Sequence, residues 1–410
     1  MIVNTLKIAI RNVFRNRRRT SLTLLSIIFG SVAIIFIGGY IDYSFYGLRE
    51  TTIRSEIGHI QIYKKGFSTL SGNETSEKYL LDKKNVASIE KILQTNPVIV
   101  QYAKRLSIVG LISNGDKNAI FVGQGVEAEK ESQLSSSLTI ESGSDFIEGD
   151  SYKILLGKDL AKQLHVKLGS RVTLLTTTYS GSMNAIDFEV IGIISRGVKS
   201  LDDKLVRIPL YNAQELLGTH GVDRIVLLLK DTPQTNSVFS WLKKELSQFP
   251  IEMKSWENLA DYYFQVRKLY LNIFKVLSFV VLIIIIFSIA NTLSMSVMER
   301  TSELGTLRAI GTSRIRVLLM FVLEGLVLGV VGGILGVLSG CLVAFIVNSL
   351  GGLYMEPPPG FSTGYQIFIL ISPRILIFSF FVSFVSAGIS SFLPALKAAR
   401  LKVVDALRHV

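Results

Sequence analysis

The stretch VLSFVVLIIIIFSIANTLSMSVM, residues 276–298, contains no charged side chain. An α-helix rises 1.5 Å per residue, so about 20 apolar residues span the hydrocarbon core of a bilayer. The stretch is long enough to do so, and it belongs to a chain of 410 residues that is 49% hydrophobic with a mean hydropathy of +0.42. We therefore predict a transmembrane helix over residues 271–298.

Three further stretches have the same character. One is uncharged and follows a basic cluster, one is interrupted only by Glu324, and one is uncharged near the end of the chain. The first has a longer apolar part than a typical signal peptide, so we interpret it as an uncleaved signal anchor. The predicted transmembrane helices besides 271–298 are residues 20–41, 316–350 and 371–396.

The net charge of +12 is concentrated beside these stretches. Residues 1–20, 299–316 and 397–410 together carry 14 basic and three acidic residues, which leaves a charge of about +1 for the remainder. Basic segments flanking apolar helices follow the positive-inside rule, whereas a nucleic-acid-binding domain would gather its charge on a folded face. We therefore expect no nucleic-acid partner, and we place both termini (1–19 and 397–410) and the 299–315 connection in the cytoplasm.

The segment 42–270, and the short loop 351–370, then lie outside the cytoplasm. Alternating or β-branched runs predict strands in the long segment, and helical spacing predicts helices between them. The fold class is an α-helical membrane protein with four transmembrane helices and a large mixed α/β extracytoplasmic domain between helices 1 and 2. The expected strands are 59–63, 171–174, 188–191 and 225–229, and the expected helices are 84–95, 158–164, 212–217 and 238–248.

Three parts of this domain receive a more specific interpretation. The Ser-rich stretch 133–144 is expected to be a surface loop or a junction between two lobes. Residues 256–275 have helical apolar spacing and predict a rigid stalk that continues into the second transmembrane helix, with 43–57 as its partner. Residues 176–184 predict a protruding hairpin tip, for which an ordinary flexible turn is the alternative.

Few residues suggest chemistry. The chain has no G-x-x-x-x-G-K-[ST] motif, so we expect no nucleotide hydrolysis by this chain, no bound cofactor and no catalytic residue. Its four histidines are scattered and its single Cys341 lies in an apolar run, so a metal site is not expected. The glycines between 325 and 340 favour close helix packing. Glu324 either reaches the membrane interface or has a functional role.

Residues 298–311 form the most informative cytoplasmic segment. Opposite charges lie three or four positions apart, Leu304, Leu307 and Ile310 have helical spacing, and Gly311 is a helix stop. The pattern predicts a short amphipathic helix between two membrane crossings. It is either an interfacial connector stabilised by membrane lipid or a helix that docks into a partner protein.

This segment, together with Glu324 and the glycines after it, resembles the permease domain of the FtsX/MacB/LolC class of ABC transporters. The C-terminal residues 394–400 and 405–408 resemble the ending of the same family, although Val403-Val404 stand where a proline is often found. Residues 157–161, 168–172 and 188–192 resemble its periplasmic core domain.

The resemblance implies a subunit of the bacterial inner membrane that pairs with an identical or a different permease and binds separate cytoplasmic ABC ATPases, which hold the ATP and Mg²⁺. Lack of a fused ATPase favours the lipoprotein-releasing LolC/LolE branch. The alternatives are an FtsX-like signalling protein that activates a cell-wall hydrolase, or an exporter of peptide, antibiotic or haem. The implied ATPase-coupling residues are Glu299, Arg300, Glu303, Leu304, Gly305, Leu307, Arg308 and Gly311. A hairpin that binds a periplasmic lipoprotein carrier would include Thr178, Tyr179, Ser180, Met183 and Asn184.

Overall fold

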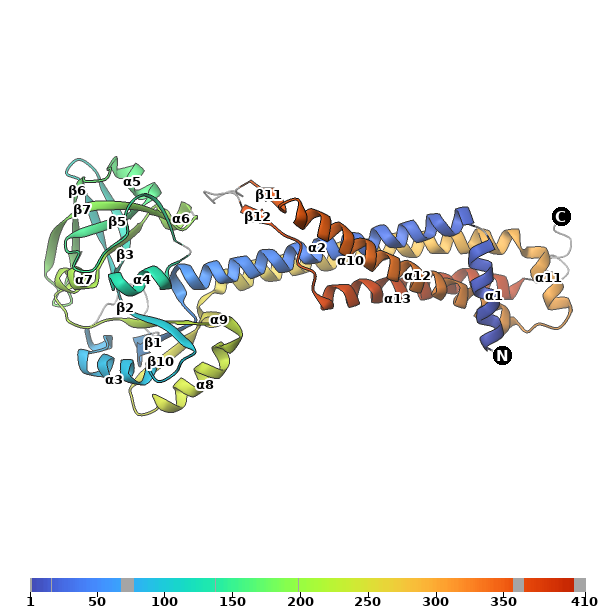
Figure 1. The fold of residues 1–410 in the computed structure, drawn as a ribbon, viewed down its shortest axis with the longest axis horizontal. Helices are drawn as coiled ribbons and strands as arrows, with labels where there is room; N and C mark the ends of the chain where they lie inside the picture. Colours follow the sequence, from blue (N-terminus) through green and yellow to red (C-terminus); the bar gives the residue numbers. More distant parts are fainter. Residues whose placement is uncertain are drawn as a thin grey trace. The chain divides into compact units, whose positions relative to one another are not determined.

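The computed structural model describes residues 2–15, 17–67, 77–136, 138–197, 199–356 and 365–401 (Figure 1). It contains two compact units. The helical bundle comprises Met1–Tyr46, Val266–Met355 and Gln366–Val410, and the α/β unit comprises Gly47–Gln265 and Glu356–Tyr365. The tail that resembles the family ending at 405–408, and residues 357–364 of the predicted outer loop, lie outside the described residues.

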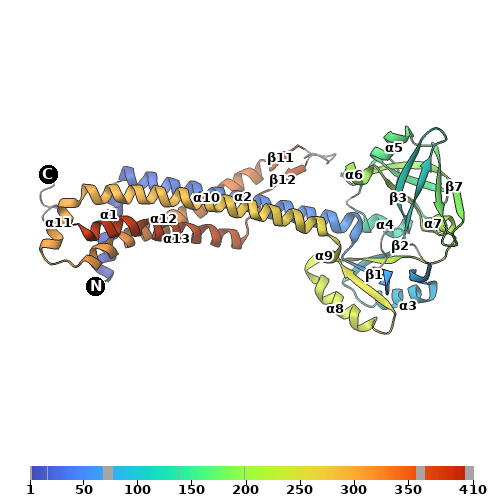
Figure 2. The same ribbon diagram turned by 180° about the vertical axis from the view of Figure 1, so that it is seen from behind.

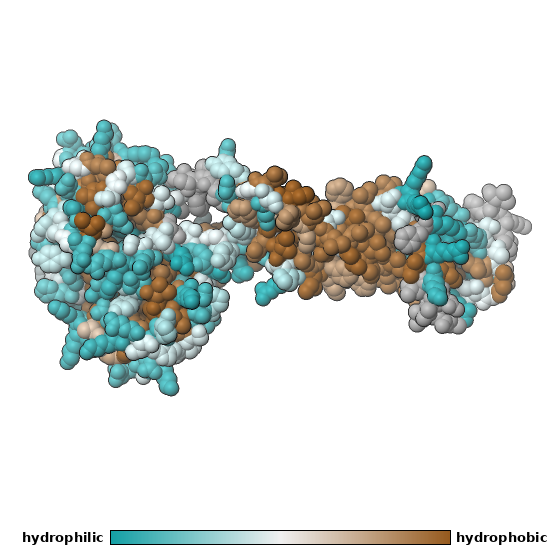
Figure 3. All heavy atoms as spheres, in the orientation of Figure 1, coloured by the Kyte–Doolittle hydropathy of each residue, from teal (hydrophilic) through white to brown (hydrophobic). Residues whose placement is uncertain are grey.

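The bundle is built from long apolar helices that run side by side in both ribbon views (Figures 1 and 2). Within the described residues, four helices are long and apolar enough to cross a membrane, namely α2, α10, α12 and α13. Hydrophobic residues cover their surface in the space-filling view (Figure 3). The helices of the bundle are α1 (Ile2–Arg15), α2 (Arg17–Thr52), α10 (Asp261–Glu299), α11 (Thr301–Ala309), α12 (Arg314–Ser349) and α13 (Pro373–Arg400), and a short pair of strands comprises β11 (Leu353–Met355) and β12 (Tyr365–Ile367).

Glycines let α12 approach two neighbours at once. A Cβ atom at Gly325 would stand 2.5 Å from the Cβ of Ser391 on α13, and one at Gly336 would stand 2.4 Å from the Cβ of Ser31 on α2. Both distances are shorter than carbon atoms tolerate. Helices in lipid gain little from excluding water, so close backbone approach of this kind is a main source of their packing energy. The glycine spacing therefore serves helix packing.

Hydroxyl groups supply hydrogen bonds between the same helices. The Ser31 and Ser383 hydroxyls are 2.9 Å apart between α2 and α13. Thr23 donates to the Thr292 hydroxyl of α10 at 2.8 Å. These short side chains satisfy their polar groups without separating the helices, and α13 presents a row of such buried serines.

The α/β unit contains a ten-stranded sheet in the order β10-β1-β9-β2-β3-β8-β5-β7-β4, with β6 pairing both β2 and β7. Because β6 makes both pairings, strands β2, β3, β8, β5, β7 and β6 form a closed ring. The strands are β1 (Ile60–Lys64), β2 (Ile99–Ser113), β3 (Asn118–Val126), β4 (Thr139–Gly143), β5 (Lys153–Gly157), β6 (Arg171–Thr177), β7 (Met183–Ser195), β8 (Leu205–Pro209), β9 (Arg224–Leu229) and β10 (Ile251–Ser255).

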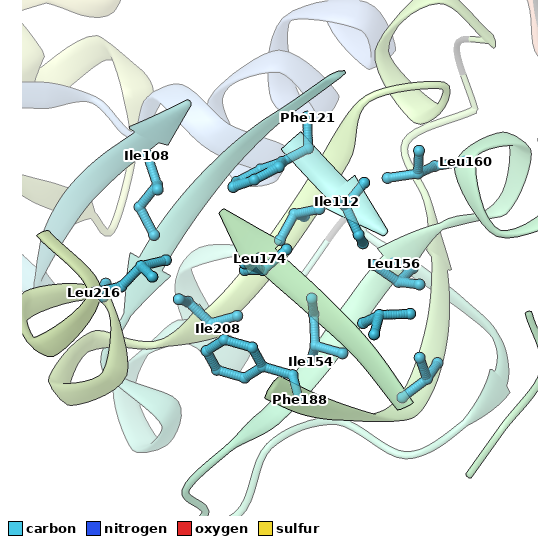
Figure 4. Close-up of a cluster of buried hydrophobic side chains, with 14 of the residues drawn as sticks. Ile108, Ile112, Phe121, Ile154, Leu156, Leu160, Leu174, Phe188, Ile208 and Leu216 are labelled. Atoms are coloured by element: carbon cyan, nitrogen blue, oxygen red, sulfur yellow. The ribbon is translucent and has the colours of Figure 1, made fainter. Parts of the chain in front are cut away.

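The ring encloses the larger of the unit's two main cores. Alternate side chains of a strand face the same side, so Ile108 and Ile112 of β2 both point inward (Figure 4). They meet Phe121 of β3 and Phe188 of β7, which are 0% and 1% exposed. Helices α5 (Lys158–Leu164) and α7 (Leu210–Leu217) contribute further leucines to this core.

A second core lies beside the ring. It joins β1, β9 and β10 to two helices, α3 (Lys83–Leu93) and α8 (Thr235–Glu245). Strand β2 links the two cores, because its first half pairs with β9 and its second half with β3 and β6. The remaining short helices of the unit are η1 (Ile53–Ile57, a π-helix), η3 (Glu77–Tyr79), α4 (Ala128–Leu134), α6 (Lys199–Asp202), η4 (Thr232–Gln234) and α9 (Trp256–Leu259).

The four predicted strands and four predicted helices of this unit all have counterparts in β1, β6, β7, β9, α3, α5, α7 and α8. Two expectations were wrong. The stretch 133–144 is not a loop throughout, because it includes the end of α4 and edge strand β4, whose exposed side chains give no apolar alternation. The helix over 256–275 is interrupted at Ala260, whose φ of −97° and ψ of 49° are not helical, so α10 begins at Asp261.

Candidate coupling site

Helix α11 occupies most of the segment predicted to couple the protein to a partner. It begins after Arg300 and ends at Ala309, and Ile310 caps it. Gly311 has a φ of 102°, a conformation that side-chain-bearing residues rarely adopt, so glycine allows the chain to reverse here before α12. The predicted stop at Gly311 is therefore correct.

The apolar residues predicted to share one face of this helix do not all point into the bundle. Leu304 is 2% exposed and packs with Val297, Phe321 and Ala395. In contrast, Leu307 is 42% and Ile310 80% exposed. Each step of three residues turns a helix by about 300°, so Ile310 lies roughly 120° around from Leu304. Gly305 is also buried, which leaves Leu307 and Ile310 as the exposed apolar residues of the predicted set.

The charged residues of the predicted set bind other helices of the bundle. Glu303 pairs with Arg15 of α1 at 3.1 Å, and Glu299 pairs with Arg19 of α2. Arg300 contacts Glu303, with 3.3 Å from its Nε to Oε2. These contacts hold the start of α11 against α1 and α2, an arrangement that the sequence prediction did not include.

Glu324 lies at the centre of this polar cluster. Its side chain is buried, and its Oε2 is 3.7 Å from Nη1 of Arg300. It also lines a cavity of about 20 Å³, together with Asn12, Arg19 and Ser296. A carboxylate within a membrane helix is costly unless it is paired, and the nearby guanidinium groups offset that cost. Glu324 therefore joins α12 to Arg300, the residue before α11.

Arg308 attaches the other end of α11 to α13. Its Nη1 donates to the carbonyl oxygens of Ala399 and Leu401 at 3.2 and 2.6 Å. The last carbonyls of a helix have no partner within that helix, so a cationic donor satisfies them and opposes the helix dipole. Helix α11 is thus held at its beginning by α1, α2 and α12, and near its end by α13.

Helix α1 was not predicted, although residues 2–15 are helical. Ala9 and Val13, four positions apart, are buried and face the bundle, while Lys7 and Arg11 are exposed. The helical spacing of these apolar residues is present in the sequence, among basic residues that also follow the positive-inside rule. The space-filling view shows hydrophilic residues gathered over α1 (Figure 3).

A second polar cluster lies within the α/β unit, which includes the last turn of α2 and η1. The carbonyl of Ser55 in the π-helical turn η1 accepts from Ser135 of α4 and from Arg207 of β8, both at 3.3 Å. Glu131 pairs with Arg105 at 2.6 Å and with Arg207 at 3.3 Å. Burial alone would raise the pKa of the Glu131 carboxyl, but the two guanidinium groups and the Ser135 hydroxyl outweigh burial and hold it below its usual value.

The fully buried imidazole of His59 lies in the same unit and makes a second set of polar contacts. Its Nδ1 accepts from the backbone N–H of Leu229 at 3.1 Å, so its Nε2 carries the proton and donates to the Thr232 hydroxyl at 3.0 Å. Thr232 in turn donates to Glu50 at 2.9 Å. Burial lowers the pKa of His59 to about 4. The imidazole is therefore neutral at physiological pH, and it ties the last turns of α2 to β9.

The hairpin between β6 and β7 differs in one respect from the prediction. Its tip closes with Thr178 N–H donating to the Ser182 carbonyl at 2.8 Å. It does not project freely, because Tyr179 N–H donates to the Leu217 carbonyl and the Asn184 amide to Glu215 and Leu216 of α7. Met183 is 71% exposed, and Ser180 is also exposed. A partner-binding role for this hairpin stays a prediction.

Neither polar cluster has the composition of a catalytic or metal centre. Within the described ranges, no group of three or more His, Cys, Asp or Glu side chains is placed to hold a metal ion. The bundle cluster consists of guanidinium–carboxylate pairs that join helices. Together with four described helices that are long and apolar enough to cross a membrane, this is the composition of a helical membrane protein in which polar side chains join one helix to another.

Comparisons with known families identify that protein class further. The model of the FtsX-like permease C-terminal domain matches residues 275–403, and the model of the MacB-like periplasmic core domain matches residues 20–244, more than half of the chain. The chain belongs to this family of ABC transporter permeases. Permease subunits of the family are generally non-catalytic, and family members work with ABC ATPase subunits.

Individual relatives are distant. An uncharacterized ABC transporter permease of Methanocaldococcus jannaschii is 24% identical over 98% of this chain and 96% of its own length. The lipoprotein-releasing system transmembrane protein LolE of Haemophilus influenzae is 28% identical over 63% of each chain. The crystal structure of the periplasmic region of MacB from Actinobacillus actinomycetemcomitans covers 48% of this chain and 90% of its own, at 17% identity and a TM-score of 0.35.

Proposed function

We propose that this chain transmits ATP hydrolysis by a separate ABC ATPase to its α/β unit, and that α11 is the element that docks on the ATPase. The exposure of Leu307 and Ile310 carries the proposal, because two large apolar side chains stand outward on a short helix that is otherwise firmly attached. Exposed apolar residues on a rigid support are typical of protein interfaces. ATP and Mg²⁺ belong to the partner subunit.

The attachments of α11 support its role in transmitting movement. A displacement applied at Leu307 and Ile310 reaches α12 through the Arg300–Glu324 contact and α13 through Arg308. Because α10 and α12 flank α11 in sequence, the displacement also acts on both of them directly. Helices that are firmly attached to one another move together, so a small displacement at one end of the bundle produces a larger rearrangement.

The proposal places α11 and both termini in the cytoplasm and the α/β unit in the periplasm. The charge distribution supports this orientation, because the arginine-rich segments lie before α2, between α10 and α12, and after α13. Four crossings put all three segments on one side of the membrane, and the positive-inside rule makes that side the cytoplasm. The cytoplasm is also the compartment in which α11 would meet an ATP-consuming partner.

The proposed cargo is a lipoprotein or another amphiphilic molecule of the inner membrane. Residues 20–41, 276–298 and 375–396 contain no charged side chain and residues 317–350 contain only Glu324, so few ionisable groups could line a polar pathway through the bilayer. A substrate that already resides in the membrane needs none. The similarity to a transmembrane protein of a lipoprotein-releasing system supports the same choice.

Replacing both exposed residues with glutamate tests the docking role. We expect L307E/I310E to reduce the ABC ATPase that co-purifies with the tagged chain by about tenfold, because two charges would have to be buried in the interface. Co-purified ATPase is identified by its P-loop peptide in mass spectrometry and quantified by ATP hydrolysis. The matched control L307M/I310M retains apolar side chains and should retain the ATPase.

Undiminished ATPase in L307E/I310E would contradict α11 as the docking element. Gly305 and Glu299 are less useful positions, since Gly305 is buried and Glu299 pairs with Arg19, so changes there would disturb the bundle itself. Cargo is tested separately by mass spectrometry of the purified complex. An acylated lipoprotein supports release, whereas a bound cell-wall hydrolase without lipoprotein would overturn transport in favour of signalling.

A further inference from the structure

A groove separates β4 from α5 on the side of the α/β unit remote from the β6–β7 hairpin tip. Its volume is about 570 Å³. Glu141 and Ser142 of β4 form one wall, and α5 and the residues that follow it form the other. The floor is apolar, with Ala161, Val166 and Ile193. The groove therefore has an apolar base and polar walls.

One wall of the groove is an open sheet edge. Strand β4 is the last strand in the sheet order, and within the described residues it pairs with β7 alone. All five of its residues are exposed. Unpaired N–H and C=O groups along an edge can accept another strand, which is a common way of binding extended peptides. A register shift between Ile140 and Ser142 limits how long such a pairing can be.

The charges around the groove are mainly positive. Lys158 crosses to Glu141 at 2.8 Å, and Lys162 lies 3.8 Å from Asp159. Lys167 lines the same wall, and the Nζ of Lys117 lies 3.0 Å from Nε2 of His165. Four lysines against two carboxylates give the groove a net charge of about +2. An acidic ligand would therefore be attracted, and it would compete with Glu141 for Lys158.

We propose that this groove binds an extended, acidic segment of another protein, which adds a short strand to β4. Its carboxylates pair with Lys158, Lys162 and Lys167, and an apolar side chain of the segment rests on Val166. Main-chain pairing supplies affinity, and the lysines supply the preference for acidic sequences. This goes beyond the proposed transport function and does not depend on it.

The groove is distinct from the hairpin predicted to bind a carrier. Met183 adjoins the hairpin tip and Ile193 adjoins the groove, at opposite ends of β7. Ten residues of extended strand separate them by about 33 Å. Variants in the groove should therefore leave the hairpin and its contacts with α7 unchanged.

The test uses the full chain in lipid nanodiscs and a fluorescein-labelled peptide that alternates glutamate and valine over eight residues. We expect saturable binding by fluorescence anisotropy, and no binding of the same peptide with lysine in place of glutamate. K162E/K167E should weaken binding by about tenfold, because both exposed cations become repulsive. The matched control K243E/K244E makes the same charge change at two exposed lysines of α8, which packs on the second core. It should bind as the wild type does.

Two further measurements separate strand addition from charge attraction. A peptide methylated on alternate backbone nitrogens keeps its charge but loses the donors that would pair with β4, and its binding should be abolished. Glu141→Gln should tighten binding several-fold by releasing Lys158. Equal binding of the acidic and basic peptides, equal binding to K162E/K167E, or full binding of the methylated peptide would each overturn the proposal. None of these outcomes depends on ATPase docking or cargo.

Discussion

The bundle and the α/β unit differ in the size of the side chains that fill their interiors. At the centre of the bundle, Gly336 lies against Ser31, and Gly325 lies against Ser391. At the centre of the α/β unit, large side chains such as Phe121 and Phe188 fill the strand ring. The interior of the bundle is therefore built from small side chains, and the interior of the α/β unit from large ones.

The difference follows from the surroundings of each unit. In water, burying an aromatic side chain removes apolar area from solvent and stabilises the fold by a few kcal/mol. In lipid, apolar side chains are equally well solvated outside, so stability comes from close backbone approach and from hydrogen bonds between short polar side chains. Removing a large side chain should therefore destabilise the α/β unit, whereas adding even one methyl group should destabilise the bundle.

The largest expected effect is the removal of a large side chain from the α/β unit. Phe188→Ala should destabilise that unit by about 3–5 kcal/mol, because the ring around it cannot collapse to fill the cavity. Both tryptophans of the chain, Trp241 and Trp256, lie in this unit, so tryptophan fluorescence during denaturation reports on it alone. Phe279→Ala, at a side chain 61% exposed on α10, is the control and should leave that transition unchanged. A loss below 1 kcal/mol for Phe188→Ala would contradict the comparison.

The next largest effect is the response of the α/β unit to acid, because burial lowers the pKa of its His59. The buried imidazole has a pKa of about 4, while the unfolded chain takes up the proton near pH 6.5. The stability that this neutral histidine contributes is complete above pH 6.5 and is lost as the pH falls towards 4, by roughly 3 kcal/mol in total. Tryptophan fluorescence at a series of pH values measures it.

The pH experiment has a control of the same residue type. His59→Gln should remove the loss of stability between pH 6.5 and 4, whatever it does to stability at neutral pH. The control is His220→Gln, at an exposed histidine of the same unit, which should keep the wild-type slope. Identical slopes in both variants would show that His59 is not the titrating group.

The smallest expected effect is the addition of one methyl group to the bundle. Gly336→Ala should destabilise it by roughly 1–3 kcal/mol, since its Cβ would lie 2.4 Å from that of Ser31. Cys341, the single cysteine, lies in the same helix, so its rate of maleimide labelling in detergent measures opening of the bundle. Gly388→Ala is the matched control, because its Cβ would meet only Leu326 at an ordinary 3.4 Å. Equal labelling of both variants would refute the close-packing interpretation.

The sequence was sufficient for the features that depend on local composition. Uncharged runs identified the four apolar helices, and charge spacing with Gly311 located α11. Strands with alternating or continuous apolar residues, such as β1 and β9, were also predicted. In contrast, β4 was missed because all its side chains are exposed, and α1 because its basic residues masked a buried stripe.

The candidate site required contacts that no local pattern contains. Glu303 meets Arg15 across 288 positions, and Arg308 meets the carbonyl of Ala399 across 91. A spacing rule on α11 grouped Leu304 with Ile310, but packing against α12 and α13 buries only Leu304. Which side of a short helix is exposed is decided by its neighbours, and those neighbours come from distant parts of the chain.

The register of β1 has a consequence for synthesis of the protein. Residues Ile60–Lys64 pair with β9 and with β10, which ends at Ser255. At about 5–20 residues per second, a ribosome needs roughly 10–40 s to make the intervening chain. During that time a strand rich in isoleucine has no partner and is prone to aggregate. The nascent chain should therefore depend on a holding chaperone on the side where this unit emerges.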